Sequence, residues 1–192
     1  MKLILASNSP RRKQILEENG FDFTVMVGNY SEKNASDPVD TAVKNAEGKA
    51  RDVFDRIKDK KDCVVIGADT VVCYNGAQLG KPQSEADAVQ TLKTLSGNVH
   101  TVVTGYAVVS ENNTVTGSDT TKVVFNELSS ELIEEYVKSG LPMDKAGSYG
   151  LQDGFPIVKE IKGDRYNVIG LPLYKIEKYI KDFKKERNSA FI

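Results

Sequence analysis

Cys63-Val64-Val65-Ile66-Gly67-Ala68-Asp69-Thr70-Val71-Val72-Cys73 is a run of β-branched and small apolar residues with one carboxylate inside it. A run of this length and composition predicts a buried β-strand. An Asn-Gly pair follows at residues 75–76, which is the signal of a two-residue hairpin turn. We therefore expect a long buried strand here and a short return strand through Leu79.

The rest of the chain alternates between strand and helix signals. Strands are expected over residues 2–6, 21–27, 99–109, 114–125, 157–161 and 166–169, and helices over residues 10–19, 38–57, 85–96, 130–139 and 173–183. The helix that begins at Pro38 has the clearest period, although Gly48 inside it costs about 1 kcal/mol relative to alanine unless a close contact requires it. Because strands and helices interleave through hairpins and crossovers, the expected fold class is α/β with a mixed sheet.

Composition limits the class of protein. The chain has 192 residues, 40% of them hydrophobic, which is enough for one globular domain over residues 1–192 without disulfide or metal support. Its formal net charge of −1 gives no general field that would hold a polyanion, so no stable nucleic-acid partner is expected. The apolar start at residues 2–6 is too short for a signal sequence, and no stretch is long enough to span a membrane. We therefore expect a cytoplasmic protein without a membrane partner.

The first indication of chemistry is Ser7-Asn8-Ser9-Pro10-Arg11-Arg12-Lys13. A strand end meets a helix N-terminus there, and three cations lie where the helix dipole disfavours positive charge. Free backbone N–H groups, serine hydroxyls and two guanidinium groups at one point are typical of a phosphate-binding site. The alternative is a capped helix with solvated arginines.

The second indication is Asp69, because burying an unpaired carboxylate costs several kcal/mol. A metal ion, a lysine or an arginine is therefore expected beside it. A carboxylate that holds a metal and orients a water molecule can split a phosphoanhydride. Alternatively, Asp69 ends its strand and caps a turn.

Other reactive residue types give weaker signals. Lys49 and Lys81 could neutralise a triphosphate, but isolated lysines are usually solvated, and Gly80-Lys81-Pro82 lacks the glycine-rich lead of a P-loop. His100 is the only histidine and no Gly-x-Ser-x-Gly motif is present, which argues against a serine hydrolase and favours a structural histidine. Both cysteines lack the paired spacing of zinc or redox sites, so we expect them in the core.

Six segments are informative as an ordered set. They are Leu5-Ala6-Ser7-Asn8-Ser9-Pro10-Arg11-Arg12, Gly67-Ala68-Asp69-Thr70-Val71-Val72, Gly80-Lys81-Pro82, Leu95-Ser96-Gly97-Asn98-Val99-His100, Asp144-Lys145-Ala146-Gly147-Ser148-Tyr149-Gly150-Leu151-Gln152 and Asn167-Val168-Ile169-Gly170-Leu171-Pro172-Leu173. Together they resemble the Maf family of nucleotide pyrophosphatases over nearly the whole chain.

The resemblance implies a mixed, twisted central sheet flanked by helices, with two lobes around a cleft, similar to ITPase-like folds. It also implies hydrolysis of a nucleoside triphosphate between the α and β phosphates, with a divalent metal cation, Mg²⁺ or Mn²⁺, as cofactor. Asp69 matches the family's catalytic acceptor of the water proton, and Asp69 and Glu32 match metal ligands. The positions expected to bind phosphate are Ser7, Arg11, Lys49 and Lys81.

Three further positions, Arg12, Thr70 and Gln152, resemble those of the branch that acts on dTTP and UTP. Thymine and uracil present an N3–H donor between two carbonyl acceptors, and a side-chain amide such as that of Gln152 can meet this edge with both of its ends. In the branch specific for 7-methyl-GTP, acidic residues are expected in place of Thr70 and Gln152. Asp153 and Gly163-Asp164 depart from the family's usual Gly and Gly-Ser, beside the expected base pocket.

Two alternatives stay open on the sequence. One is house-cleaning of a modified pyrimidine nucleotide such as 5-methyl-UTP or pseudo-UTP, which shares the same base edge. The other is a non-catalytic regulator of septum formation, in which Arg11 and Arg12 would bind a partner or nucleic acid. A homodimer is a candidate assembly because dimers are the commonest oligomers, although no interface can be identified in the sequence.

Overall fold

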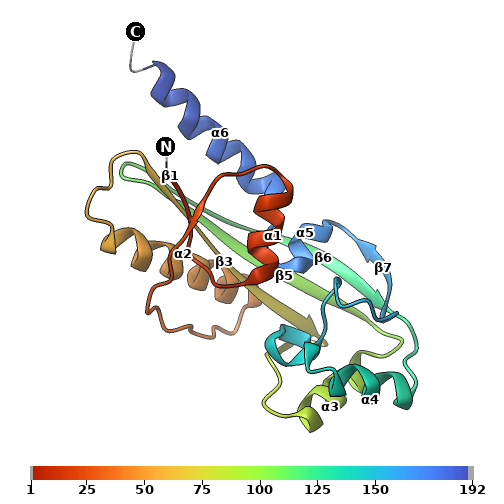
Figure 1. The fold of residues 1–192 in the computed structure, drawn as a ribbon. Helices are drawn as coiled ribbons and strands as arrows, with labels where there is room; N and C mark the ends of the chain where they lie inside the picture. Colours follow the sequence, from red (N-terminus) through yellow and green to blue (C-terminus); the bar gives the residue numbers. More distant parts are fainter. Residues whose placement is uncertain (1, 190–192) are drawn as a thin grey trace. The chain divides into compact units, whose positions relative to one another are not determined.

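Seven strands form one mixed sheet in the computed structural model, which describes residues 2–189 and their side chains through Phe183 (Figure 1). The strands are β1 (Lys2–Leu5), β2 (Thr24–Val25), β3 (Cys63–Tyr74), β4 (Ala77–Leu79), β5 (Val99–Val109), β6 (Thr114–Phe125) and β7 (Val158–Lys162). The helices are α1 (Pro10–Glu18), α2 (Pro38–Arg56), α3 (Glu85–Leu95), α4 (Ser130–Lys138), α5 (Arg165–Ile169) and α6 (Leu173–Ser189), with 3₁₀ turns η1 (Leu141–Asp144) and η2 (Ala146–Ser148). The strand order is β2-β1-β3-β5-β6-β7, and β4 pairs with β3. The predicted α/β class with a mixed sheet and flanking helices is confirmed.

The chain divides into two compact units. The first consists of the described parts of Met1–Asp69, Thr104–Asp119 and Gly170–Ile192, and the second of Thr70–Val103 and Thr120–Ile169. The long strands β3, β5 and β6 each contribute residues to both units. The cleft that the family resemblance implies stays a prediction. No helix described between residues 2 and 189 is long and apolar enough to cross a membrane.

In the first unit, β1 lies between β2 and β3 and runs parallel to both. The predicted helix after β1 is confirmed, with Ser9 as its N-cap and Pro10 in its first turn. The strand predicted over residues 21–27 is shortened to the two residues of β2. Both of these are exposed, and β2 is an edge strand that pairs only with β1, so little burial supports a longer strand.

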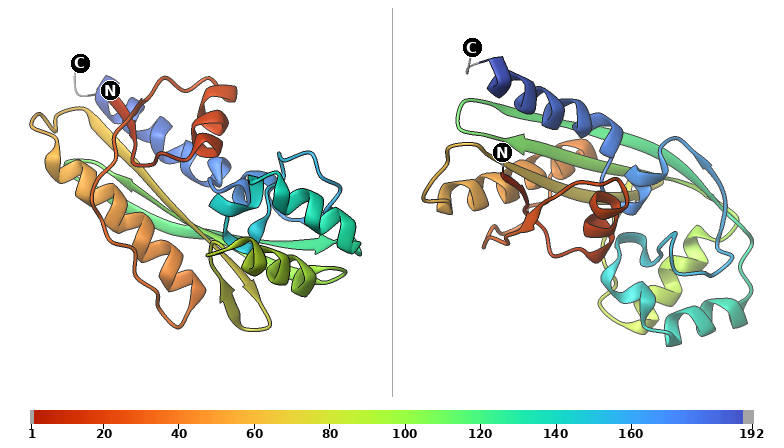
Figure 2. Two further views of the ribbon diagram at one scale, coloured as in Figure 1. Left: turned by 60° about the horizontal axis from the view of Figure 1, so that its bottom comes forward. Right: turned by 45° about the horizontal axis from the view of Figure 1, so that its top comes forward.

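Helices α2 and α6 cover opposite faces of the first unit's strands (Figure 2). Alternate strand residues point to opposite faces, and two neighbours on β5 show this directly. Gly105 lies against α2 so closely that a Cβ there would be 2.2 Å from the carbonyl carbon of Ala42. Tyr106 points the other way, where burial and then the Tyr179 phenol of α6 raise its pKa. The α2 residues buried in the described core are Ala42, Ala46, Ala50, Val53 and Phe54.

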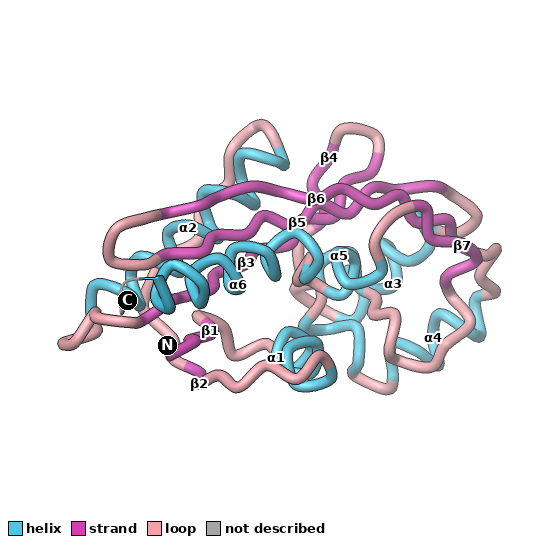
Figure 3. The backbone as a smooth tube through the Cα atoms, turned by 90° about the horizontal axis from the view of Figure 1, so that it is seen from above, coloured by secondary structure: helices cyan, strands magenta, loops and turns pink. Residues whose placement is uncertain are grey.

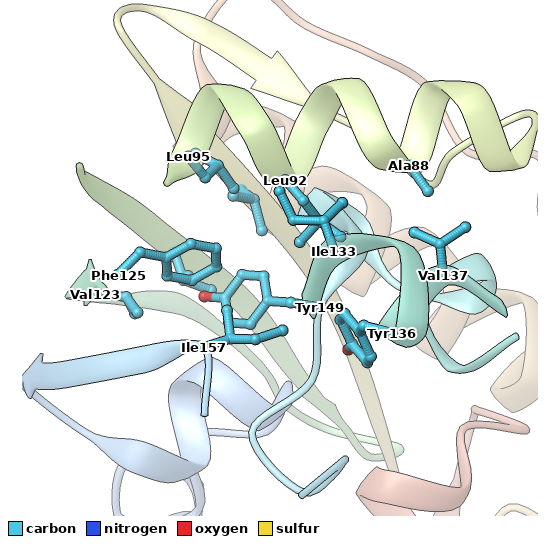
Figure 4. Close-up of a cluster of buried hydrophobic side chains, with 12 residues drawn as sticks. Ala88, Leu92, Leu95, Val123, Phe125, Ile133, Tyr136, Val137, Tyr149 and Ile157 are labelled. Carbon is cyan, nitrogen blue, oxygen red and sulfur yellow. The ribbon is translucent and has the colours of Figure 1, made fainter. Parts of the chain in front are cut away.

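The second unit has its own apolar core, in which α3 and α4 pack against each other. In the turn between β3 and β4, Asn75 and Gly76 both have positive φ (49° and 79°), as the Asn-Gly signal predicts. Tyr149 and Phe125 pack edge to face in this core, with ring centroids 4.8 Å apart (Figure 4). The buried residues of this cluster are Val72, Ala88, Leu92, Leu95, Val102, Val123, Phe125, Ile133, Tyr136, Val137, Tyr149 and Ile157.

The last predicted strand, residues 166–169, is wrong, because this segment belongs to α5 (Figure 3). The Asp164 carboxylate accepts the backbone N–H groups of Tyr166 at 3.1 Å and Asn167 at 3.0 Å, which caps a helical turn. The buried Asn167 amide donates to Thr121 Oγ1 at 2.9 Å. These polar contacts overrode the β-branched pattern on which the strand prediction depended.

Candidate functional site

The loop between β1 and α1 connects Ser7, Ser9 and Arg12. Ser7 Oγ accepts the Ser9 backbone N–H at 3.2 Å and Arg12 Nη1 at 3.1 Å, and Ser9 Oγ accepts the Arg12 backbone N–H at 3.5 Å. Arg12 Nε also donates to the carbonyl of Gly170 at 2.8 Å. The first turn of α1 contains no acidic residue, so its positive end is complemented by no carboxylate of its own. That this helix start binds an anion stays a prediction.

Asp69 lies inside β3, which continues to Tyr74, so it does not end its strand as one alternative supposed. Its side chain is only 12% exposed, and its Oδ1 accepts Lys49 Nζ of α2 at 2.7 Å. The same ammonium contacts Glu32 Oε1 at 2.6 Å, although Glu32 is 58% exposed. A single lysine therefore holds two carboxylates from different segments, and the buried charge of Asp69 has the partner that its burial requires.

Asn45 completes this group and was not predicted from the sequence. It is buried, and its Nδ2 donates to Asp69 Oδ2 at 3.1 Å. A usable signal did exist, because Asn45 precedes Lys49 by four residues and therefore lies on the same face of α2. An amide within an otherwise apolar helical stripe requires a buried polar partner.

The helix start and the carboxylate group lie near each other in the first unit. Burial lowers the pKa of the Arg12 guanidinium, while Asp69 and Glu32 raise it and Arg11 lowers it. The structure thus brings together six of the predicted site residues. They are Ser7, Arg11, Arg12, Glu32, Lys49 and Asp69.

The other predicted site residues belong to the second unit. Thr70 is half-buried on β3, whereas Lys81 after β4 and Gln152 in a turn are exposed. The backbone N–H of Gly147 donates to the carbonyl of Gly80 at 3.1 Å, which joins the segments that carry Lys81 and Gln152. That these residues act on the same ligand as those of the first unit stays a prediction.

Asp153, next to Gln152, has a structural explanation. Its side chain is 8% exposed and pairs with Lys145 Nζ at 3.3 Å, and Tyr136 OH donates to it at 2.5 Å. Burial and the bond to Asp153 raise the pKa of Tyr136, so the phenol stays protonated and can donate. Asp153 therefore anchors the turn that carries Gln152 to the second unit's own core.

The chain thus combines an α/β fold with a buried carboxylate paired with lysine and a helix start that carries cations, an arrangement found in enzymes that act on phosphorylated ligands. The family model described as Maf-like protein matches residues 2–183, and the chain belongs to the Maf family. The dTTP/UTP pyrophosphatase of Thermococcus gammatolerans is 48% identical over 172 residues, covering 89% of this chain and 91% of that one. The dTTP/UTP pyrophosphatase of Aquifex aeolicus is 47% identical over 184 residues, covering 95% of each chain.

Among solved structures, the Ham1 protein of Staphylococcus aureus has a TM-score of 0.44 with this chain at 14% sequence identity. The match covers 66% of this chain and 73% of the Ham1 chain.

Proposed function

We propose that this protein hydrolyses nucleoside triphosphates, with dTTP and UTP favoured, to a nucleoside monophosphate and pyrophosphate. The observation that carries the proposal is the buried Asp69 carboxylate, held by Lys49 at 2.7 Å and close to the cationic start of α1. A carboxylate next to an anion-binding helix start can activate water beside a phosphate. The relatives at 47% and 48% identity, which are dTTP/UTP pyrophosphatases, support the same reaction and base preference.

Asp69 accepts the proton of the water that attacks the α-phosphorus. General-base assistance of this kind contributes about 10²- to 10⁴-fold to the rate. The cationic and hydroxyl groups orient the triphosphate and stabilise the charge that develops on the departing pyrophosphate. The residues assigned to this role are Ser7, Arg11, Lys49 and Lys81.

A divalent cation, Mg²⁺ or Mn²⁺, is the proposed cofactor. The proposal is supported by Glu32 and Asp69, whose oxygen atoms converge on the one ammonium group of Lys49. In the described part of the chain no cluster of three or more His, Cys, Asp or Glu side chains could hold a metal. Hard cations in nucleotide enzymes are commonly held by one or two carboxylates together with substrate phosphates. Bound there, the ion would polarise the phosphoryl oxygens and the attacking water.

Base selection is assigned to Arg12, Thr70 and Gln152. The Gln152 amide matches the donor and acceptor edge shared by thymine and uracil, and the anchored Asp153 supports the position of its turn. A base that covered these polar groups and left them unpaired would be rejected by several orders of magnitude. The methyl group of 5-methyl-UTP lies off the N3–H edge. Pseudo-UTP, whose ribose is attached at C5, also keeps an N3–H donor between two carbonyl acceptors, so both nucleotides present the same edge.

We also infer that residues 1–192 act as one functional domain, because the family model spans both compact units. A nucleotide substrate is consistent with a cytoplasmic location and requires no membrane or stable nucleic-acid partner. A homodimer is the proposed assembly, on the general prevalence of such dimers.

The proposed reaction is tested by measuring pyrophosphate release from dTTP with Mg²⁺ or Mn²⁺. Asp69→Asn should lower kcat by about 10²- to 10⁴-fold. Asp119→Asn is the matched control, because Asp119 is a half-buried carboxylate of the same unit that contacts Tyr174 and Lys175 instead. An Asp69→Asn variant as active as the wild type would remove Asp69 from the mechanism.

A substrate panel separates the remaining alternatives. dTTP, UTP, CTP, 5-methyl-UTP and 7-methyl-GTP are compared at equal concentration, and the highest kcat/KM is expected for dTTP and UTP. A clear preference for 5-methyl-UTP would instead favour house-cleaning of modified nucleotides. No turnover on any substrate, together with tight binding of a division protein, would favour a non-catalytic regulator.

A further inference from the structure

Asn45 is a buried amide on α2, with 1% of its surface exposed, and it has polar contacts in two directions. Its Nδ2 donates to Asp69 Oδ2 at 3.1 Å, and its Oδ1 accepts the backbone N–H of Lys33 at 2.9 Å. Tyr30 OH makes a longer contact of 3.5 Å with the same Oδ1. Asn45 therefore links β3 to the loop that precedes α2.

The orientation of this amide is set by the loop backbone. A backbone N–H can only donate, so the atom of Asn45 that faces Lys33 must be the carbonyl oxygen. The NH₂ group is then directed at Asp69, and a carboxylate is the acceptor that suits it best. Rotating the amide by half a turn would lose both contacts at once.

The Asp69 carboxylate is consequently held at both oxygens from the same helix. Lys49 contacts Oδ1 at 2.7 Å and Asn45 contacts Oδ2 at 3.1 Å. The two donors are four residues apart, so they project from one face of α2. Two separate donors fix the carboxylate plane, whereas Lys49 alone would let it rotate about its own contact.

The loop held by Asn45 also carries the second carboxylate. Glu32 directly precedes Lys33, whose N–H is bound by Asn45. Tyr30 in the same loop packs on α2 at Gly48, where a Cβ would lie 2.1 Å from the Tyr30 ring. The position of Glu32, which is itself exposed, therefore depends on backbone contacts around it and on Lys49.

We propose that Asn45 is a positioning residue that couples the Glu32 loop to Asp69 and so sets the arrangement of the two carboxylates. The inference rests on the proposed function for its effect on catalysis. Its structural part, the tie between Lys33 and Asn45, stands on the contacts alone.

Two substitutions separate the two contacts of Asn45. Asn45→Leu removes both, so the Lys33 amide should exchange its hydrogen at least about tenfold faster, and kcat for dTTP should fall by about 10- to 100-fold, the size expected for a lost hydrogen bond to a charged group. Asn45→Asp keeps an acceptor for Lys33 but loses the donor to Asp69. It should keep slow exchange at Lys33 and still lose kcat. In both variants KM should change less than kcat.

Thr41→Val is the matched control. Thr41 is a buried polar residue on the same helix whose Oγ1 accepts the Ala35 N–H at 2.9 Å, so it ties the same loop through a different contact. Its kcat should stay within about threefold of the wild type, the range of a lost neutral contact away from the reacting groups.

The inference is overturned if Asn45→Leu leaves the exchange of Lys33 unchanged, or if its kcat matches that of Thr41→Val. A wild-type protein that releases no pyrophosphate from any triphosphate would refute the proposed function instead. The exchange rate at Lys33 would then decide the inference by itself.

Discussion

His100 should make the stability of this protein depend on pH in a way that one substitution removes. The imidazole is 2% exposed, contacts Tyr149 OH through Nε2 at 2.8 Å, and packs edge to face on Phe125. Its Nδ1 has no hydrogen-bond partner. Burial lowers the pKa of His100 from 6.5 to about 4, so the ring is neutral in the folded state at neutral pH.

The size and sign of the effect follow from the two pKa values. Between pH 6.5 and about 4 the unfolded chain binds a proton at His100 and the folded chain does not, so acid favours unfolding. The stability that the neutral imidazole contributes is fully present above pH 6.5 and is lost as the pH falls. The loss levels off below about pH 4. At 1.36 kcal/mol per pKa unit, the free energy of unfolding should drop by about 2.5 kcal/mol at pH 4.5 from this residue.

The assay compares wild type with His100→Phe by urea unfolding at pH 7 and pH 4.5, followed by circular dichroism. Carboxylates titrate in both proteins, and no other histidine is present. The difference between the two proteins in stability lost on acidification therefore reports His100 alone. His100→Phe should be less stable at pH 7, because Tyr149 OH loses its partner, and should lose about 2.5 kcal/mol less on acidification. If the two proteins lost equal stability between these pH values, the imidazole would not be kept neutral by the fold.

Three substitutions test the backbone contacts. Gly105→Ala should lower the free energy of unfolding, measured in urea, by about 3 kcal/mol. The added Cβ would clash with the α2 backbone at Ala42, which cannot move aside. Unchanged stability would mean that α2 does not pack against Gly105. Gly48→Ala should raise helix propensity by about 1 kcal/mol but displace the Tyr30 ring, so kcat for dTTP should fall without a loss in thermal stability. Asp164→Ala should cost about 1 kcal/mol and speed hydrogen exchange of the α5 amides, whereas unaltered exchange would contradict the capping role.

The regular parts of the fold could be predicted because their signals are local. The hairpin at Asn75-Gly76 and the helix start at Ser9 agree with the sequence to within a residue, since turn and cap chemistry act over a few residues. The failures concern short segments with little periodicity. The helical turn α5 depends on Asp164 and on the burial of the Asn167 amide, which is a long-range contact that no window of sequence contains.

The sequence could predict those site residues whose chemical type alone indicates a function. A carboxylate in an apolar strand needs a partner wherever it is, so Asp69 could be selected before its surroundings were known. Its partners could only be proposed, because Lys49 and Glu32 are two charged residues among many. Asn45 belongs to no motif, and its spacing to Lys49 indicated only a shared helix face. Its importance comes from Asp69 and Lys33, which it contacts on two other segments.

The sequence by itself determined the order of strands and helices along the chain except at residues 166–169, the family, and the residue types available for phosphate chemistry. These properties depend on hydrophobic period, local capping and ordered motifs, which are all readable along the chain. Only the tertiary structure decided that Lys49 lies between Asp69 and Glu32 and that Asn45 binds both Asp69 and the loop. Those contacts join residues far apart in sequence, and their geometry depends on how α2 packs on the sheet. Hydrophobic burial favours this packing, but no local sequence pattern specifies its geometry.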